Sequence, residues 1–108
     1  MAKCRITVLE TQFNEKLAQE YGVENFGPCP FHKVGQVFGA GYVKPEGFCD
    51  EAWKCIQHYV FAIVHGAQGT FFRNQWVWQE GVAINSCNDG LRPVIFKVER
   101  IHKQKDIK

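Results

Sequence analysis

The sequence predicts an α+β fold in which a small antiparallel or mixed sheet packs on one long central helix and one short N-terminal helix. Three observations lead to this prediction: a helical apolar period between residues 50 and 66, apolar alternation in residues 3–10 and 94–101, and clusters of glycine, proline and asparagine between these segments. The chain of 108 residues is long enough for one core and too short for two. We therefore expect a single domain over residues 1–101 and a basic flexible tail over residues 102–108.

The chain opens with a predicted strand and a short helix. Apolar side chains at positions 4, 6 and 8 alternate with more polar neighbours, which is typical of a strand with one buried face. Thr11 or Asn14 can cap the helix that follows, since both side chains accept hydrogen bonds from free backbone N–H groups. Gly22 ends this helix.

Two glycine- and proline-rich loops flank a predicted short strand. The segment GPCP at residues 27–30 cannot be helical through its middle, because proline removes a donor and forces the preceding residue towards extended geometry. We expect a turn at Gly35 that leads into a short strand, and a second loop over residues 39–47.

The central helix is predicted from Asp50, as its N-cap, to Gly66, which stops it. Glu51 in the first turn meets the positive end of the helix dipole, and His65 suits the last turn. Apolar residues recur at steps of three and four and form one broad face. The members of this face are Trp53, Ile56, Tyr59, Val60, Ile63 and Val64.

The last third of the chain predicts a β-hairpin after an aromatic segment. Residues 67–80 contain four large aromatic side chains without a clear period, so we expect an ordered loop or an edge strand. Residues 81–87 and 94–101 read as two strands joined by the turn residues Asn88, Asp89 and Gly90.

Composition limits the function classes. The formal net charge of +2 arises from 13 basic and 11 acidic residues, so the chain lacks the basic field of a nucleic-acid-binding protein. No apolar run approaches the roughly 20 residues that span a bilayer, and no secretory signal is apparent. Five cysteines, an odd number, do not form the framework of a small secreted protein. We expect a cytoplasmic protein with reduced cysteines that binds neither nucleic acid nor membranes.

Three motifs in order resemble those of a family of short prokaryotic proteins of unknown function. They are PCPFHKVG at residues 28–35, PEGFCDEAW at residues 45–53 and DGLRPVIF at residues 89–96. The resemblance covers nearly the whole chain except the basic tail. It places Cys29, His32, Lys33, Cys49 and Cys87 at the motif positions of the family.

Cys49 is the leading candidate for chemistry, because it lies at the start of the central helix. Free N–H groups and the helix dipole favour a thiolate there, whereas Asp50 and Glu51 add opposing negative charge. His32 is the candidate base for Cys49, and the predicted activity is thiol chemistry on a small molecule. Lys33, Trp53 and Arg92 are candidates for contacts with that substrate.

Two other function classes remain open. Cys29 and His32 are spaced so that both can reach one metal ion, and Cys49 and Cys87 would complete a zinc or iron site. Alternatively, the cysteines are buried packing residues. A third class is a non-catalytic oligomeric binding module, in which the segment with Phe71, Phe72, Trp76 and Trp78 covers the core, lines a small-molecule pocket or meets another subunit. We also expect a homo-oligomer, formed through the aromatic segment of residues 71–78 or an exposed edge of the late hairpin.

Overall fold

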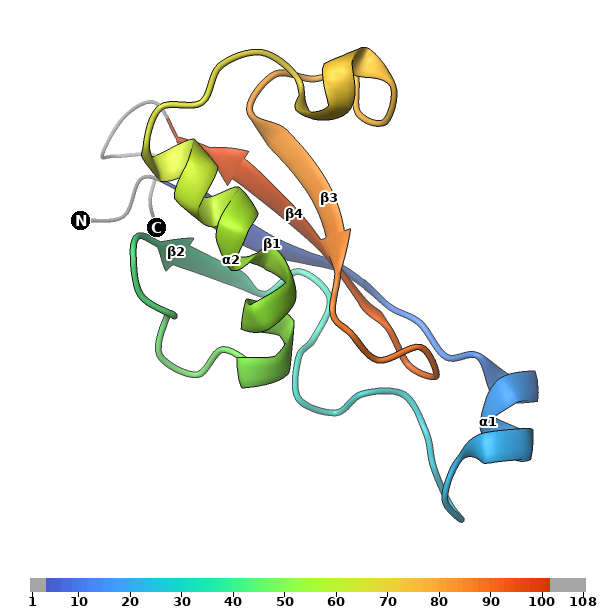
Figure 1. Ribbon diagram of the computed structural model, residues 1–108. Coiled ribbons are helices and arrows are strands. Elements are labelled where there is room, and N and C mark those ends of the chain that lie inside the picture. Colours follow the sequence, from blue (N-terminus) through green and yellow to red (C-terminus); the bar gives the residue numbers. More distant parts are fainter. Residues whose placement is uncertain (1–3, 102–108) are drawn as a thin grey trace.

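The computed structural model describes residues 4–101, and it confirms the predicted α+β class. The predicted basic tail lies outside the described residues. Figure 1 shows a sheet with one long helix across one face. In chain order the elements are β1 (Cys4–Thr11), α1 (Glu15–Tyr21), β2 (Val37–Ala40), α2 (Asp50–Val64), the 3-10 helix η1 (Phe71–Asn74), β3 (Val82–Ser86) and β4 (Val94–Arg100).

The sheet has the strand order β2-β1-β4-β3, and every pair is antiparallel. The antiparallel alternative of the prediction is therefore correct. Ile6 of β1 lies opposite Phe38 of β2 and Val98 of β4, so three strands contribute side chains to the same row. The β1–β4 register shifts between Val8 and Glu10, which is a β-bulge near the end of the pairing.

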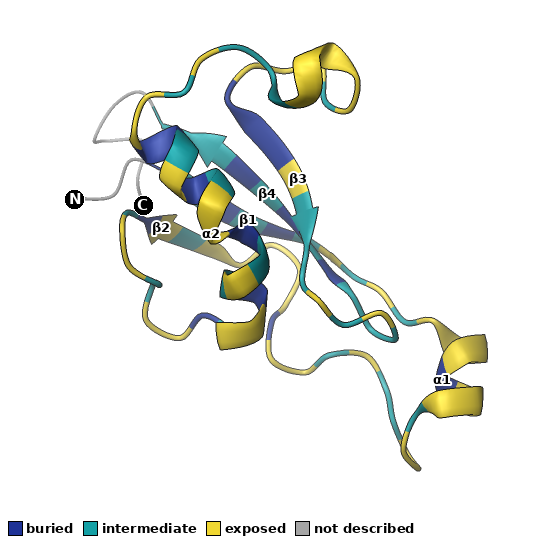
Figure 2. Cartoon of the chain, viewed as in Figure 1, coloured by how far each residue is buried: buried dark blue, intermediate teal, exposed yellow. Residues whose placement is uncertain are grey.

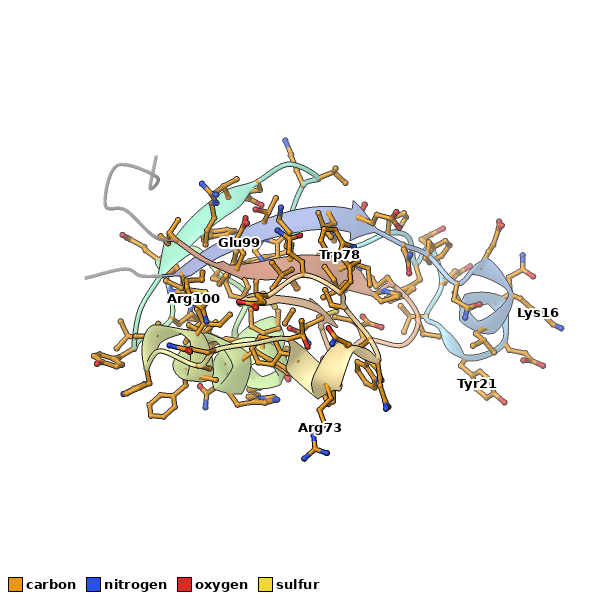
Figure 3. All side chains as sticks on the ribbon, turned by 90° about the horizontal axis from the view of Figure 1, so that it is seen from above. Lys16, Tyr21, Arg73, Trp78, Glu99 and Arg100 are labelled. Carbon is orange, nitrogen blue, oxygen red and sulfur yellow. The ribbon has the colours of Figure 1, made fainter. Side chains whose placement is uncertain are left out.

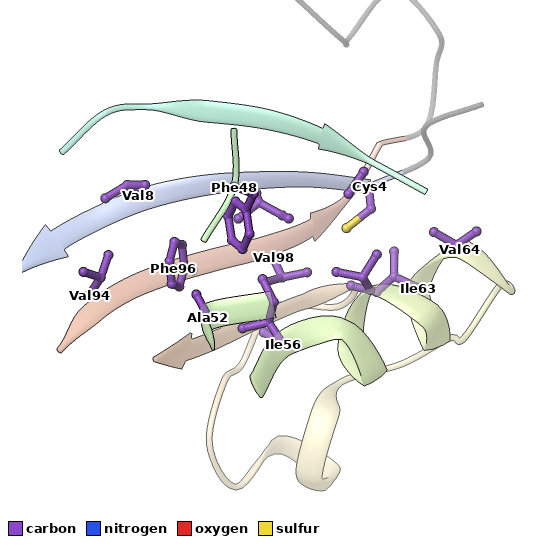
Figure 4. Packing of buried hydrophobic residues seen from close by; sticks show 14 residues of the cluster. Cys4, Val8, Phe48, Ala52, Ile56, Ile63, Val64, Val94, Phe96 and Val98 are labelled. Carbon is purple, nitrogen blue, oxygen red and sulfur yellow. The ribbon is translucent and has the colours of Figure 1, made fainter. Parts of the chain in front are cut away.

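The core lies between the sheet and α2, as Figures 2 and 4 show. Cys4, Ile6 and Val8 are buried and face the helix, so the predicted apolar face of the first strand is confirmed. On α2 the buried positions are Ala52, Ile56, Val60, Ile63 and Val64. Trp53 and Tyr59, which the periodicity also assigns to this face, are partly buried and pack at its margin.

The outer face of the sheet is more polar than the face against α2. Arg5 Nε lies 3.2 Å from Glu99 Oε2, and Lys97 Nζ lies 3.5 Å from the same oxygen. Figure 3 shows the side chains on both sides of the sheet. Among residues 4–101, no helix has the length and apolar character needed to cross a bilayer.

The N-cap of α2 is Cys49, which corrects the prediction that Asp50 has this role. Cys49 has extended dihedral angles, φ −66° and ψ 128°, whereas Asp50 is already helical. The side chain of Asp50 pairs with Lys44, with 3.1 Å between Oδ1 and Nζ. At the other end, Gly66 adopts a φ of +86°, a left-handed conformation that suits the predicted stop.

The short helix α1 lies beyond the end of the sheet (Figure 1). Asn14 is its N-cap, and the Asn14 side chain accepts a hydrogen bond from the Leu17 N–H at 3.3 Å. The backbone of the preceding segment bonds to the β3–β4 connection, through Gln12 N–H to the Pro93 carbonyl and Asn14 N–H to the Leu91 carbonyl. The position of α1 is therefore set by the same connection that follows β3.

The aromatic segment between α2 and β3 is an ordered loop with a 3-10 turn, and the edge-strand alternative is wrong. Phe72, Arg73 and Asn74 have positive φ angles of 59°, 53° and 67°. The Thr70 hydroxyl accepts a hydrogen bond from the Asn74 N–H at 2.9 Å and closes the turn. We call residues 70–78 the aromatic turn.

Candidate functional site

Three of the predicted site cysteines line one pocket of about 340 Å³. They reach it from three segments: Cys29 from the proline-rich loop, Cys49 from the start of α2, and Cys87 from the end of β3. The remaining lining residues are Pro30, Phe31, Glu51, Asn88, Asp89 and Arg92. We call this the cysteine pocket.

Cys29 is held by the loop that contains it. Pro28 and Pro30 flank the residue, and each ring restricts its own φ angle and the residue before it, so this part of the chain has few alternative conformations. Cys29 is partly buried and packs against the hydrophobic core. Cys29 therefore contacts the hydrophobic core and also lines the pocket.

Cys49 is positioned through its backbone. Its N–H donates a hydrogen bond to His32 Nε2 at 3.3 Å, and its carbonyl accepts the first hydrogen bond of α2, from the Trp53 N–H at 3.0 Å. The preceding residue is fixed as well, because Lys44 Nζ donates to the Phe48 carbonyl at 2.7 Å. The Cys49 side chain makes no capping hydrogen bond of its own, so the thiol is available to the pocket.

The ring of His32 is buried, with 3% of the residue exposed. Because Nε2 accepts from the Cys49 N–H, Nδ1 carries the proton and donates to Gln36 Oε1 at 3.2 Å. Burial lowers the pKa of His32, and the hydrogen bond to Gln36 opposes this effect. The ring is thus neutral, and it contacts the backbone of Cys49 while lying outside the pocket lining. This geometry favours a positioning role over the predicted role of base.

Aromatic rings surround His32 on several sides. The centroid of its ring lies 4.9 Å from that of Phe31, 5.1 Å from that of Phe48 and 5.8 Å from that of Phe96. The contacts with Phe31 and Phe96 are edge-to-face, with interplanar angles of 76° and 83°, and such contacts hold a ring in one orientation. The start of α2 is therefore tied to the centre of the core through a single imidazole.

Cys87 continues the edge of β3 by one residue. Its N–H donates to the Val94 carbonyl at 3.1 Å, and the Val94 N–H approaches the Cys87 sulfur at 3.4 Å. A backbone donor at the sulfur orients the thiol. The backbone of β4 thus orients the Cys87 sulfur, which lines the pocket.

The turn after Cys87 carries the charged part of the pocket. Arg92 Nε donates to Asp89 Oδ2 at 3.2 Å, and the guanidinium lies 4.4 Å from the ring centroid of Phe26. Burial acts to raise the pKa of Asp89, but hydrogen bonds from the Leu91 and Arg92 N–H groups and from the Arg92 side chain outweigh it and lower the pKa. Arg92 therefore stacks on Phe26 and pairs with Asp89, and these two contacts fix its guanidinium at the wall of the pocket.

Glu51 connects the helix to the hairpin turn. Its carboxylate accepts a hydrogen bond from Asn88 Nδ2 at 2.9 Å and pairs with Lys54 Nζ at 3.0 Å. The hydrogen bond from Asn88 has the largest effect on the pKa of Glu51 and lowers it, and Lys54 lowers it further. Since Asp50 pairs with Lys44, both carboxylates next to Cys49 have a cationic neighbour. The negative charge that opposes a Cys49 thiolate is thereby reduced.

The pocket does not contain every predicted site residue. Lys33 is exposed, and its backbone N–H donates to Gln36 Oε1 at 3.2 Å. Trp53 packs on Phe48, with 6.1 Å between the ring centroids. Neither lines the cysteine pocket.

Several lining residues were absent from the predicted site, namely Pro30, Phe31, Glu51, Asn88 and Asp89. Each lies within two positions of Cys29, Cys49 or Cys87 in the sequence. This closeness in the sequence to the three cysteines is a signal from which these lining residues can be predicted. From the sequence, Glu51 is expected only as a charge beside Cys49, and Asn88 and Asp89 only as turn residues.

The predicted metal ligands do not form a metal site. Within the described part of the chain, no group of three or more His, Cys, Asp and Glu side chains is arranged to hold a metal ion. Cys29, His32, Cys49 and Cys87 are therefore not assembled as the zinc or iron centre considered from their spacing. His32 directs its two ring nitrogens to Gln36 and to the Cys49 backbone instead.

Comparison with protein-family models, with curated proteins and with solved structures found no match for this chain. The resemblance to a family of short prokaryotic proteins continues to rest on the three motifs. The residues of the site supply thiols from three segments, the apolar side chains of Pro30 and Phe31, and the guanidinium of Arg92.

Proposed function

We propose that the cysteine pocket binds a small molecule and acts on it by thiol–disulfide exchange. The observation that carries the proposal is that Cys29, Cys49 and Cys87 line a single pocket although they are far apart in the sequence. An exchange reaction needs one thiolate to attack a disulfide and a second thiol to release the product. A pocket with three thiols supplies both.

The reaction proceeds in two displacements. The Cys49 thiolate attacks one sulfur of the small disulfide, a new S–S bond forms to Cys49, and the first half of the substrate leaves as a thiolate. A second cysteine thiolate then attacks Cys49 sulfur, and the other half leaves. The substrate gains two electrons and two protons and becomes two thiols, while the protein becomes a disulfide.

Cys49 is the attacking residue in this proposal because of its position. It caps the 15-residue helix α2, whose N-terminal dipole favours negative charge, and both neighbouring carboxylates are paired with lysines. Cys29 and Cys87 are the two candidates for the second thiol. Arg92, on the pocket wall, suits a substrate with an anionic group.

The proposed location is the cytoplasm. All five cysteines are free thiols in the structure, and a small-molecule thiol reductant of the cytoplasm would return the protein disulfide to this state. Reduction by such a thiol uses the same two displacements in reverse, with the reductant ending as a disulfide.

Reaction with a small aromatic disulfide tests the proposal. We expect a fast phase in the wild-type protein, a mixed disulfide on Cys49 by mass spectrometry, and loss of the fast phase in Cys49→Ser without loss of the fold. Replacing the second thiol, Cys29→Ser or Cys87→Ser, should trap the mixed disulfide instead. The variant that traps it identifies the residue that completes the reaction.

Two cysteines outside the pocket lining are the matched controls. Burial raises the pKa of Cys4 to about 12, and burial together with the charges of Cys87 and Glu51 raises the pKa of Cys55. Cys4→Ser and Cys55→Ser should keep the fast phase. A fast phase that survives Cys49→Ser, or that disappears only with Cys55→Ser, would contradict the assignment of Cys49.

A further inference from the structure

β3 is an open edge of the sheet. In the order β2-β1-β4-β3, the described residues place β4 on one side of Val82–Ser86 and no strand on the other. Soluble proteins commonly protect such edges with lysine, proline or a covering element, because free N–H and C=O groups pair with other chains. The sequence of β3, VAINS, contains no charge or proline that opposes pairing.

The free backbone groups of β3 belong to alternate residues. The Cys87 N–H bonds to the Val94 carbonyl of β4, so the odd-numbered residues of the strand direct their backbone groups towards β4. Val82, Ile84 and Ser86 consequently direct theirs to the open side. An antiparallel pair of two β3 strands centred on Ile84 matches N–H to C=O at all three positions, with a two-fold axis through Ile84.

From this self-complementarity we propose that two copies of the chain pair through β3, and that the aromatic turn of each copy completes the cysteine pocket of the other. In a register centred on Ile84, Gly81 of one copy lies opposite Cys87 of the second copy. The aromatic turn ends three residues before Gly81, whereas Cys87 is the first residue after β3 and lines the pocket. Figure 1 shows that within one copy the turn and the β3–β4 connection lie at opposite ends of β3, so antiparallel pairing brings one beside the other.

The aromatic turn has the surface of an interface. The rings of Phe72 and Trp76 stack with 4.1 Å between centroids, yet Trp76 is 69% exposed and Trp78 is 82% exposed. Aromatic side chains dominate the buried centres of protein interfaces. Three consecutive non-glycine residues, Phe72 to Asn74, hold left-handed angles, a strained conformation that presents these rings outward.

Charge also suits this arrangement. Arg73 is the single charged residue of positions 70–79, and Figure 3 shows it pointing away from the body of the molecule. The pocket is lined by the carboxylates of Glu51 and Asp89 and by the guanidinium of Arg92. Asp89 is paired with Arg92 and Glu51 with Lys54, but the Glu51 side chain is 56% exposed, so its carboxylate remains accessible to an incoming cation.

Cross-linking tests the pairing. In a hydrogen-bonded antiparallel pair the two Cα atoms lie about 5.5 Å apart, within the range that a disulfide spans. Mild oxidation of Ile84→Cys should therefore give a covalent dimer joined at the introduced thiols. Thr7→Cys, on the same outer face but in the interior strand β1, is the control and should not cross-link.

Ile84→Lys provides the complementary test, because it sets two like charges against each other at the axis. Ile84 is 40% exposed in one copy, so the substitution should leave the fold intact by circular dichroism. We expect a dimer mass for the wild-type protein and a monomer mass for Ile84→Lys by light scattering. A wild-type monomer at high protein concentration, or a failure of Ile84→Cys to cross-link, would overturn the pairing.

The contribution of the turn to the pocket is measured by alkylation of the pocket thiols with iodoacetamide. Trp76→Ala in the dimer, and Ile84→Lys in the monomer, should both raise the alkylation rate of Cys49. An unchanged rate in a dimeric Trp76→Ala protein would show that the turn does not cover the pocket. The proposal that the aromatic turn covers the pocket rests on the proposed function of the pocket. Alkylation by iodoacetamide needs no disulfide exchange, so this experiment can fail while the exchange reaction is observed, and the reverse.

Discussion

At the level of single residues, His32 joins the core to the candidate site. Its ring is buried among phenylalanines, and its two nitrogens bond to Gln36 and to the backbone of Cys49. The sulfur of Cys49 is not among these partners. The His32 ring therefore fixes the backbone at the start of α2, and this backbone determines the position of the Cys49 thiol.

Lowering the pH should destabilise the protein through His32. Burial depresses the folded-state pKa below the unfolded value of 6.5, so the neutral ring contributes stability that is present above pH 6.5 and is lost as the pH falls towards the folded pKa. Urea unfolding at several pH values between 7 and 5 measures this loss. His32→Gln should reduce the pH dependence, whereas His58→Gln, at an exposed position of α2, should leave it unchanged.

His32→Ala should cost stability at neutral pH as well. Removing a buried ring and leaving the Cys49 N–H without its acceptor is expected to cost roughly 3–5 kcal/mol of unfolding free energy. The same urea titration gives this value. A cost near zero would show that the start of α2 is fixed without the ring.

At the level of elements, α2 organises the core. Its buried positions follow the predicted apolar period and face β1, β3 and β4. Ile56 is fully buried near the middle of the helix, with Ala52 one turn before it and Val60 one turn after. The helix is therefore held by packing of one face, and its ends by the Cys49 backbone and Gly66.

A graded series at Ile56 should measure this packing. We expect Ile56→Val to lower the unfolding free energy by about 0.5–1.5 kcal/mol and Ile56→Ala by about 2–5 kcal/mol, because each removes buried methyl groups and leaves a cavity. Gln57→Ala, on the exposed face, should change it by less than about 0.5 kcal/mol. Equal effects at positions 56 and 57 would contradict the assigned faces.

At the level of the whole molecule, the chain has a packed body and a projecting part. The body is the sheet with α2, whereas α1 lies beyond the sheet and buries only Ala18 (Figure 2). The stacking of Arg92 on Phe26 and the backbone bonds from Gln12 and Asn14 hold this part to the β3–β4 connection. Few buried apolar contacts support it.

Hydrogen exchange should separate these two parts. Amides of β1 and β4 are expected to exchange only through global unfolding, and those of α1 through local opening at a much lower free energy. Mass spectrometry of proteolytic fragments after exchange resolves residues 15–21 from residues 94–100. Protection of α1 equal to that of β4 would show that the projecting part unfolds with the body.

Local patterns in the sequence determined the elements and four of the nine residues that line the cysteine pocket. Apolar alternation located β1 and β4, the period of three and four located α2, and the glycines at positions 22, 35 and 66 marked the turns. The N-cap was misplaced by one residue, because Asp50 has a good capping side chain but its backbone is already helical. The grouping of Cys29, Cys49 and Cys87 followed from their place in loops and at ends of elements.

Only the tertiary structure decided how these parts meet. Strand order placed β3 at an edge, and packing placed His32 under the Cys49 backbone, while Lys33 and Trp53 lie outside the pocket. Periodicity reports which face of an element is apolar, but it contains no information on contacts between residues distant in sequence. Those contacts depend on strand register and on the path of irregular loops, which are set by the packing of the whole chain.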